Sequence, residues 1–298
     1  MGALGESRFG RVLTAMITPF DEDGGLDLDG AQQLARWLVD HGSDGLVING
    51  TTGESPTLTA TESVDLFRAV RQAVDVPVIA GTGSNDTAHA IRQSEAAAGI
   101  GVDGLLVVAP YYNRPSQAGL DQHFRMIAAA TPLPVILYDI PIRTGRKVET
   151  DTIVRLAHEV PTIVGLKDAA GDPAETATLV ASAPEDFEVF SGDDNLTLPF
   201  LSVGARSVIS VTAHWAGQEL QAMFAAFDAG DVAEARRINA RLIPSYAFQS
   251  TADAPTPVPT KAMLRSLGLP AGGCRPPMGP TPDGLEVQAK EVWDALQG

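Results

Sequence analysis

Short, strongly apolar segments recur along the first two thirds of the chain. Their starts lie about 20 to 33 residues apart, which is the length of one strand–helix unit. They do not alternate apolar with polar residues, which is typical of parallel strands that helices cover on both faces. We expect eight strands, at residues 12–17, 45–49, 77–81, 104–108, 134–138, 162–167, 187–191 and 207–211.

The stretches between these segments carry apolar residues at helical spacing. Residues 28–42, for example, place Leu34 and Leu38 on one side of a helix. Residues 151–160 predict another helix, and Asp151 at its start is the expected N-cap. Strands and helices therefore alternate.

Eight strand–helix units in succession predict a (β/α)8 TIM barrel of the α/β class. A doubly wound open sheet is the alternative that the pattern leaves open. After the eighth strand the pattern becomes all-helical, and a Pro-rich connector interrupts it at residues 249–259. We expect a barrel carrying the active site over residues 1–230 and a C-terminal helical extension over residues 231–298.

The charge and composition narrow the range of partners. A net charge of −16 argues against nucleic acid or an anionic membrane as partner, because both require a basic surface. No apolar run reaches the ~18 residues of a membrane span, and the N-terminus lacks the pattern of a signal peptide. Cys274 is the only cysteine, so an intrachain disulfide is impossible and a reducing, cytoplasmic location is expected.

Candidate chemistry gathers where the expected strands end. In a barrel these ends and the loops after them form one rim, which carries the active site. The second strand is followed by Thr51 and Thr52, the fifth ends in Tyr138 with Arg143 close behind, and the sixth ends in Lys167. The five histidines are scattered, without the spacing of a zinc site, so no metal is expected.

Lys167 is the candidate nucleophile. An uncharged amine attacks a ketone, loses water and forms an iminium that withdraws electrons from the neighbouring carbon. A dehydrated barrel mouth would lower the pKa of the amine enough to uncharge it. The alternative is a lysine that extends to solvent or pairs with Asp168.

The neighbouring rim residues have matching roles. The Tyr138 phenol could transfer the protons that imine formation requires, or it could be an aromatic residue at the edge of the core. Thr51 and Thr52 could hold a carboxylate and relay protons, or simply form a turn. Arg143 suits bidentate carboxylate binding, or it is a solvated loop charge.

Together these residues lie in motifs that resemble the pyruvate-dependent class I aldolases of the dihydrodipicolinate synthase and N-acetylneuraminate lyase family. The resemblance covers nearly the whole chain, and several motifs in the right order are more specific than any one of them. The motifs are "TAMITPF" (14–20), "GTTGES" (50–55), "VIAGTGSN" (78–85), "PYYNRPSQ" (110–117), "YDIPIRTG" (138–145), "GLKDAAGD" (165–172), "SGDD" (191–194) and "VISVTAH" (208–214).

The resemblance implies a catalytic role for four residues. It assigns Lys167 to a Schiff base, Tyr138 to proton transfer, and Thr51 with Tyr112 to a proton relay. In this family the tyrosine that matches Tyr112 comes from a neighbouring subunit. The resemblance therefore implies a homotetramer built from dimers.

The resemblance also implies the substrates. Thr52, Gly192 and Ile209 match positions that hold pyruvate, Ile209 through its backbone. Arg143 matches the arginine that, in the dihydrodipicolinate synthase branch, binds the carboxylate of aspartate semialdehyde. The implied reaction joins pyruvate and L-aspartate-4-semialdehyde to give 4-hydroxy-tetrahydrodipicolinate, at the start of the diaminopimelate route to lysine. No metal or organic cofactor is implied, because the iminium itself is the electron sink.

Two departures from the family pattern stand out. The lysine-feedback site of some members has a histidine and a glutamate where this chain has Ala60 and His89, so we expect weak or absent inhibition by lysine. The segment "GGCRPPMGP" (272–280) is less usual, and the sequence offers no physical account of it.

Three other functions compete with this interpretation. An aldolase on the same scaffold could act on a sugar acid or another aldehyde, and only the acceptor would distinguish it. A barrel could bind pyruvate without catalysis, although every expected catalytic side chain is present. Nucleotide binding rests on "GTGSND" (81–86), which lacks the last glycine of the dinucleotide-binding motif.

Overall fold

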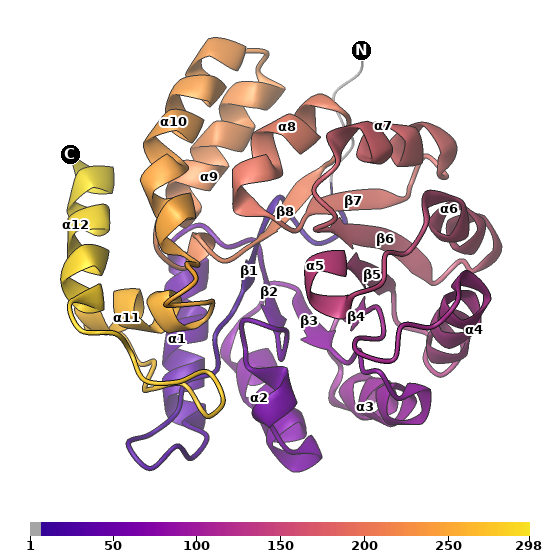
Figure 1. Ribbon diagram of the computed structural model, residues 1–298, viewed down its shortest axis with the longest axis horizontal. Helices are drawn as coiled ribbons and strands as arrows, with labels where there is room; N and C mark the ends of the chain where they lie inside the picture. The colour runs from indigo at the N-terminus through magenta and orange to yellow at the C-terminus, as the bar shows by residue number, and fades with distance from the viewer. Residues whose placement is uncertain (1–6) are drawn as a thin grey trace.

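Eight parallel strands form the centre of the molecule in the computed structural model, which describes residues 7–298 (Figure 1). Each strand pairs with the next in chain order, and β8 pairs with β1 to close the barrel. The expected barrel is confirmed and the open-sheet alternative is wrong. The strands are β1 (Val12–Ala15), β2 (Gly45–Ile48), β3 (Val78–Gly81), β4 (Gly104–Val108), β5 (Val135–Asp139), β6 (Ile163–Asp168), β7 (Glu188–Ser191) and β8 (Ser207–Ser210).

Helices follow the strands and surround the barrel (Figure 1). Two short 3-10 helices, η1 (Ser55–Thr57) and η2 (Asp194–Leu196), lie in the loops after β2 and β7. The surrounding helices are α1 (Leu28–Asp40), α2 (Ala60–Ala73), α3 (Thr87–Ile100), α4 (Gln117–Ala128), α5 (Pro141–Thr144), α6 (Thr150–Glu159), α7 (Pro173–Ser182), α8 (Thr197–Ser202) and α9 (Ala213–Asp228).

The start of α6 differs from the expectation. The helix begins at Thr150 with Glu149 in the N-cap position, and no side chain caps it. Asp151 therefore lies in the first turn, where its negative charge still interacts favourably with the helix dipole. The expected N-cap role of Asp151 is wrong because the N-cap is Glu149, two residues earlier in the chain.

The strands are buried on both faces, which explains their lack of alternation. One set of side chains fills the barrel interior, including Leu13, Val47, Ile79 and Phe190. The opposite set packs against the surrounding helices. The filled interior is a core and not a pore, so chemistry is confined to the rim.

The C-terminal extension consists of α10 (Val232–Phe248), α11 (Val258–Ser266) and α12 (Leu285–Gln297). These helices gather on one side of the barrel, next to α9 (Figure 1). The expected boundary at residue 230 falls between α9 and α10, yet the extension shares one apolar cluster with Val12 and Val208 of the barrel. Among residues 7–298, no helix is long and apolar enough to cross a membrane.

His214 joins two strand ends at the rim. Its Nε2 atom accepts a hydrogen bond from the Ile17 N–H at 3.0 Å, and its Nδ1–H donates to the Val211 carbonyl at 2.7 Å. The side chain is fully buried, and this burial lowers its pKa to about 4. The neutral imidazole thus fixes the β8–α9 turn to the end of β1.

This burial predicts an acid-sensitive fold. Below pH 6.5 the unfolded chain binds a proton on His214 that the folded chain refuses until about pH 4, so stability falls as the pH drops through this window. The contribution of one such group is at most about 1.4 kcal/mol per pH unit. Urea unfolding at pH 7 and pH 5 should show a smaller difference for His214→Gln than for the wild type. His158→Gln, at an exposed position, should leave the difference unchanged.

Candidate active site

A cavity of about 180 Å³ opens at the carboxyl ends of the strands. It lies at the rim, because the side chains below it fill the barrel interior. Six of the eight residues that the sequence predicted for the site line it together. They are Thr51, Thr52, Tyr138, Arg143, Lys167 and Gly192.

Lys167 lies at the end of β6 and is only 6% exposed. Burial lowers the pKa of its amine to about 8, although the charges of Asp194 and Asp193 act in the opposite direction. Its Nζ atom has no carboxylate partner within ion-pair distance among the described residues. Lys167 therefore does not extend to solvent. It does not pair with Asp168 either, because the Asp168 carboxylate accepts hydrogen bonds from the Thr176 hydroxyl and the Ala170 N–H.

Tyr138 is the direct cross-strand partner of Lys167. The two residues are in register between β5 and β6, and the Lys167 Nζ atom lies 4.4 Å from the centroid of the tyrosine ring. Burial raises the pKa of the phenol, while the Arg143 charge and a side-chain hydrogen bond with Thr51 lower it. The phenol therefore stays protonated beside the amine and can donate its proton.

Arg143 lies in the one-turn helix α5, which Pro141 begins and Gly145 ends in the left-handed conformation. The guanidinium is exposed at the cavity rim and makes no ion pair among the described residues. Its charge reaches both Tyr138 and Lys167. An unpaired arginine at the mouth of a cavity is available to an anionic ligand.

The position of Gly192 admits no side chain. A Cβ atom there would lie 2.8 Å from the Ala169 Cβ atom and 2.9 Å from the Asp168 carbonyl oxygen. Ile209 lies one strand further, buried at 1% exposure in the barrel interior. Its side chain is in the core, and Ile209 is not among the residues that line the cavity, whereas Val211, just after β8, is.

Sequence reasoning missed two carboxylates of the site. Asp194 is buried, and it accepts hydrogen bonds from the N–H groups of Val211 and Thr212 and from the Ser210 hydroxyl. Burial raises its pKa and that of Asp193. The motif "SGDD" contained both residues, but its pattern alone did not distinguish a wall of the cavity from an ordinary turn.

The extension also contributes to the cavity, which the sequence did not predict. Gln249, Ser250 and Thr256 of the Pro-rich connector line it. The Thr212 hydroxyl donates to Gln249 Oε1 at 3.1 Å, which ties the connector to the β8–α9 turn. Only the tertiary fold brings this segment to the rim.

Tyr112 does not reach the cavity of its own chain. Its side chain is 90% exposed, and its backbone has φ = +73°, an unfavourable conformation for a residue with a side chain. A second cavity of about 240 Å³ lies nearby and is lined by Tyr111 and His89. Ala60, at the exposed start of α2, does not line it.

No group of three or more histidine, cysteine, aspartate or glutamate side chains within residues 7–298 is arranged to hold a metal ion. The residues that line the cavity are an amine, a phenol, a guanidinium, hydroxyls and buried carboxylates. This set suits covalent capture of a carbonyl compound that carries a carboxylate.

Comparison with known proteins gives a consistent result. The sequence model described as the dihydrodipicolinate synthetase family matches residues 8–295. A relative from Moorella thermoacetica, named 4-hydroxy-tetrahydrodipicolinate synthase, is 55% identical over 273 residues, which cover 91% of this chain and 92% of the relative.

Solved structures agree. A dihydrodipicolinate synthase from Bacillus anthracis superposes with a TM-score of 0.93 and 44% identity, covering 97% of this chain and 98% of that one. The enzyme from Cyanidioschyzon merolae, solved with lysine bound, gives a TM-score of 0.95 and 43% identity, covering 98% and 99%.

Proposed function

The chain belongs to the dihydrodipicolinate synthetase family, and we infer that it is a lyase that forms 4-hydroxy-tetrahydrodipicolinate, the first step of diaminopimelate and lysine biosynthesis. Its substrates are then pyruvate and L-aspartate-4-semialdehyde. One observation supports this function above the others: a buried amine of lowered pKa faces a phenol across two neighbouring strands at the barrel mouth.

The first half of the reaction uses the Lys167 amine. The amine attacks the keto carbon of pyruvate, and the resulting hydroxyl leaves as water with a proton from Tyr138. The iminium withdraws electrons, so the methyl group loses a proton and becomes a nucleophilic enamine. Thr52 and Gly192 border the space proposed for the pyruvate carboxylate. The backbone of Ile209 is proposed to contact the same carboxylate.

The second half forms the carbon–carbon bond. The enamine carbon attacks the aldehyde carbon, whose oxygen takes up a proton and becomes a hydroxyl. The amine of the semialdehyde then attacks the iminium carbon, closes the ring and releases Lys167. Thr51 and Tyr112 carry protons in this scheme, and Arg143 holds the carboxylate of the semialdehyde.

The choice of acceptor rests on Arg143. An unpaired guanidinium at the rim favours a short aldehyde with a carboxylate over a sugar aldehyde. An aldolase for sugar acids or other aldehydes is the alternative within the same chemistry. A pyruvate-binding protein without catalysis would not need Tyr138 beside the amine.

The assembly is proposed to be a homotetramer built from dimers. The support is Tyr112, an aromatic side chain held in an unfavourable backbone conformation yet almost fully exposed. Such strain is maintained where it serves function, and a neighbouring subunit offers the site that the tyrosine lacks in its own chain. The cytoplasmic location stays a prediction.

Weak inhibition by lysine also stays a prediction. The enzyme from C. merolae was solved with lysine bound. In this chain the second cavity presents His89 instead of a carboxylate that would pair with the amine of lysine.

Trapping of the imine tests the mechanism. Borohydride with pyruvate should attach a reduced adduct to Lys167, located by peptide mass mapping, and Lys167→Arg should give none. Because the amine must be uncharged, the initial trapping rate should rise about fivefold between pH 7 and pH 8 and level off above about pH 8. No adduct on Lys167 in the wild type would contradict the lyase function.

Substitution of Arg143 tests the acceptor. Arg143→Ala should raise KM for aspartate semialdehyde by about 10- to 100-fold, the loss expected for a charge-assisted hydrogen-bonded pair. The rate of pyruvate trapping should stay within about twofold. Arg68→Ala, on the outer surface of α2, is the matched control. Faster turnover of sugar aldehydes than of the semialdehyde by the wild type would favour the alternative aldolase.

Mixing two inactive variants tests the shared site. In a dimer of Lys167→Arg and Tyr112→Phe chains, one site keeps Lys167 and receives an intact Tyr112 from the other chain. Refolding an equal mixture should therefore restore about a quarter of wild-type activity. If Tyr112 acts in its own chain, the mixture should be no more active than the average of the two parents.

A further inference from the structure

Glu54 closes the turn that carries Thr51 and Thr52, and its side chain is buried in an ion pair with the C-terminal extension. Its Oε1 atom lies 2.7 Å from the Nζ atom of Lys261 on α11, and both side chains are 1% exposed. Lys261 is one of the largest fully buried side chains of the molecule. The catalytic scheme above uses neither residue.

The carboxylate is held from a second direction by the unusual segment 272–280. The Arg275 N–H donates to Glu54 Oε2 at 2.9 Å, while Lys261 Nζ donates to the Gly273 carbonyl at 2.7 Å. The Lys261 ammonium also lies 4.1 Å from the centroid of the Phe20 ring. The segment therefore completes the environment of the ion pair.

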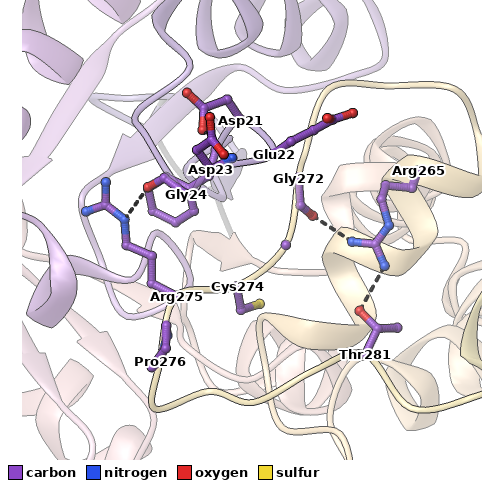
Figure 2. A pocket seen from close by; sticks show the side chains of 12 residues that line it. Asp21, Glu22, Asp23, Gly24, Arg265, Gly272, Cys274, Arg275, Pro276 and Thr281 are labelled. Carbon is purple, nitrogen blue, oxygen red and sulfur yellow. Dashed lines mark hydrogen bonds between the residues drawn. The ribbon is translucent and has the colours of Figure 1, made fainter.

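The side chain of Arg275 fastens the segment to the barrel. It donates to the Gly24 carbonyl at 2.9 Å (Figure 2) and to Glu62 at 2.6 Å at the start of α2. Figure 2 shows Cys274 between Arg275 and Arg265, beside a surface cavity of about 620 Å³. The contacts of Arg275 give a physical reason for the segment that the sequence left without an account.

The backbone of Glu54 links these contacts to the active site. Glu54 has φ = +56°, in the left-handed region that costs energy for a residue with a side chain. Its N–H donates to the Thr51 carbonyl at 3.1 Å, so it forms part of the same turn. The Gly53 carbonyl accepts from the Thr18 hydroxyl at 2.6 Å. The turn is thus held at its backbone and at the Glu54 carboxylate.

We propose that Glu54 and Lys261, with the segment 272–280, are positioning residues that set the Thr51–Thr52 turn for catalysis. A buried carboxylate cannot leave its cation without a large desolvation cost, so the pair fixes where the turn can lie. Displacing a relay hydroxyl by about 1 Å is sufficient to lower turnover markedly. This inference rests on the proposed function, because it assigns Thr51 and Thr52 to the reaction.

Two variants separate positioning from stability. Lys261→Met keeps the buried stem and removes the cation, and it should lower kcat at least tenfold and raise KM for pyruvate. The double variant Glu54→Gln/Lys261→Met removes both charges, so it should recover thermal stability relative to Lys261→Met while kcat stays at least tenfold low. A double variant with wild-type kcat would overturn the proposal, because the pair would then serve stability alone.

The matched control is Glu188→Gln. Glu188 is a buried residue of similar whole-residue exposure, 5% against 3% for Glu54, and its carboxylate accepts hydrogen bonds from Ser7 and Arg8 at the amino end of β7. This variant should change stability and leave kcat and KM for pyruvate within about twofold.

Cys274 gives an independent readout of the segment. It is the only cysteine, and burial raises the pKa of its thiol to about 11, so Ellman's reagent should react slowly with the wild type. Lys261→Met should react at least tenfold faster because the segment is released, although loss of the Lys261 charge by itself raises the thiol pKa further. Glu188→Gln should not react faster. Equal labelling rates in Lys261→Met and the wild type would contradict the role of the segment.

Failure of the premise is distinguishable from failure of this inference. A wild-type chain that gives no pyruvate adduct with borohydride would remove the proposed function itself. A different result would remove only the positioning role. In that case borohydride would trap the pyruvate imine in the wild type, and Lys261→Met would show the same trapping rate and the same turnover. If Lys261→Met does not fold, Arg275→Ala leaves the ion pair intact and should still speed Cys274 labelling and lower kcat about threefold.

Discussion

The chemistry proposed for this molecule depends on one constraint: an amine must be kept out of water and must not form an ion pair with a carboxylate. Lys167 satisfies this constraint because it lies at the end of β6, at the barrel rim. The side chains that fill the barrel interior exclude water from beneath it. The register between β5 and β6 places Tyr138 directly beside Lys167, because these two residues are cross-strand partners. The same two strands therefore supply both the buried amine and the phenol beside it.

Much of this arrangement could be predicted from the sequence. Eight apolar runs at regular intervals specified the barrel, and the residues that end or follow the second, fifth and sixth runs specified five lining residues of one cavity. The reason is that a parallel barrel brings the carboxyl ends of all its strands to one rim. A residue that ends a strand in the sequence can therefore be placed at that rim. Asp151 failed as a cap because helix starts depend on backbone geometry that an apolar pattern does not contain.

The residues that were missed share a different cause. Asp194 accepts hydrogen bonds from the backbone just after the next strand, and Gln249 reaches the rim only because the extension folds back over it. Likewise, the partners of Glu54 lie near the other end of the chain. Local pattern carries no information on such long-range contacts.

The distance along the chain between Glu54 and Lys261 has a consequence for the order in which the molecule is made. A chain still growing on the ribosome possesses all eight strands and Lys167 well before α11 has been synthesised. Until then the Glu54 carboxylate lacks the Lys261 ammonium, so burying it would cost desolvation free energy and hydration is favoured. Completion of the barrel strands and burial of the Glu54 carboxylate against Lys261 are therefore separate events in the synthesis of each new chain.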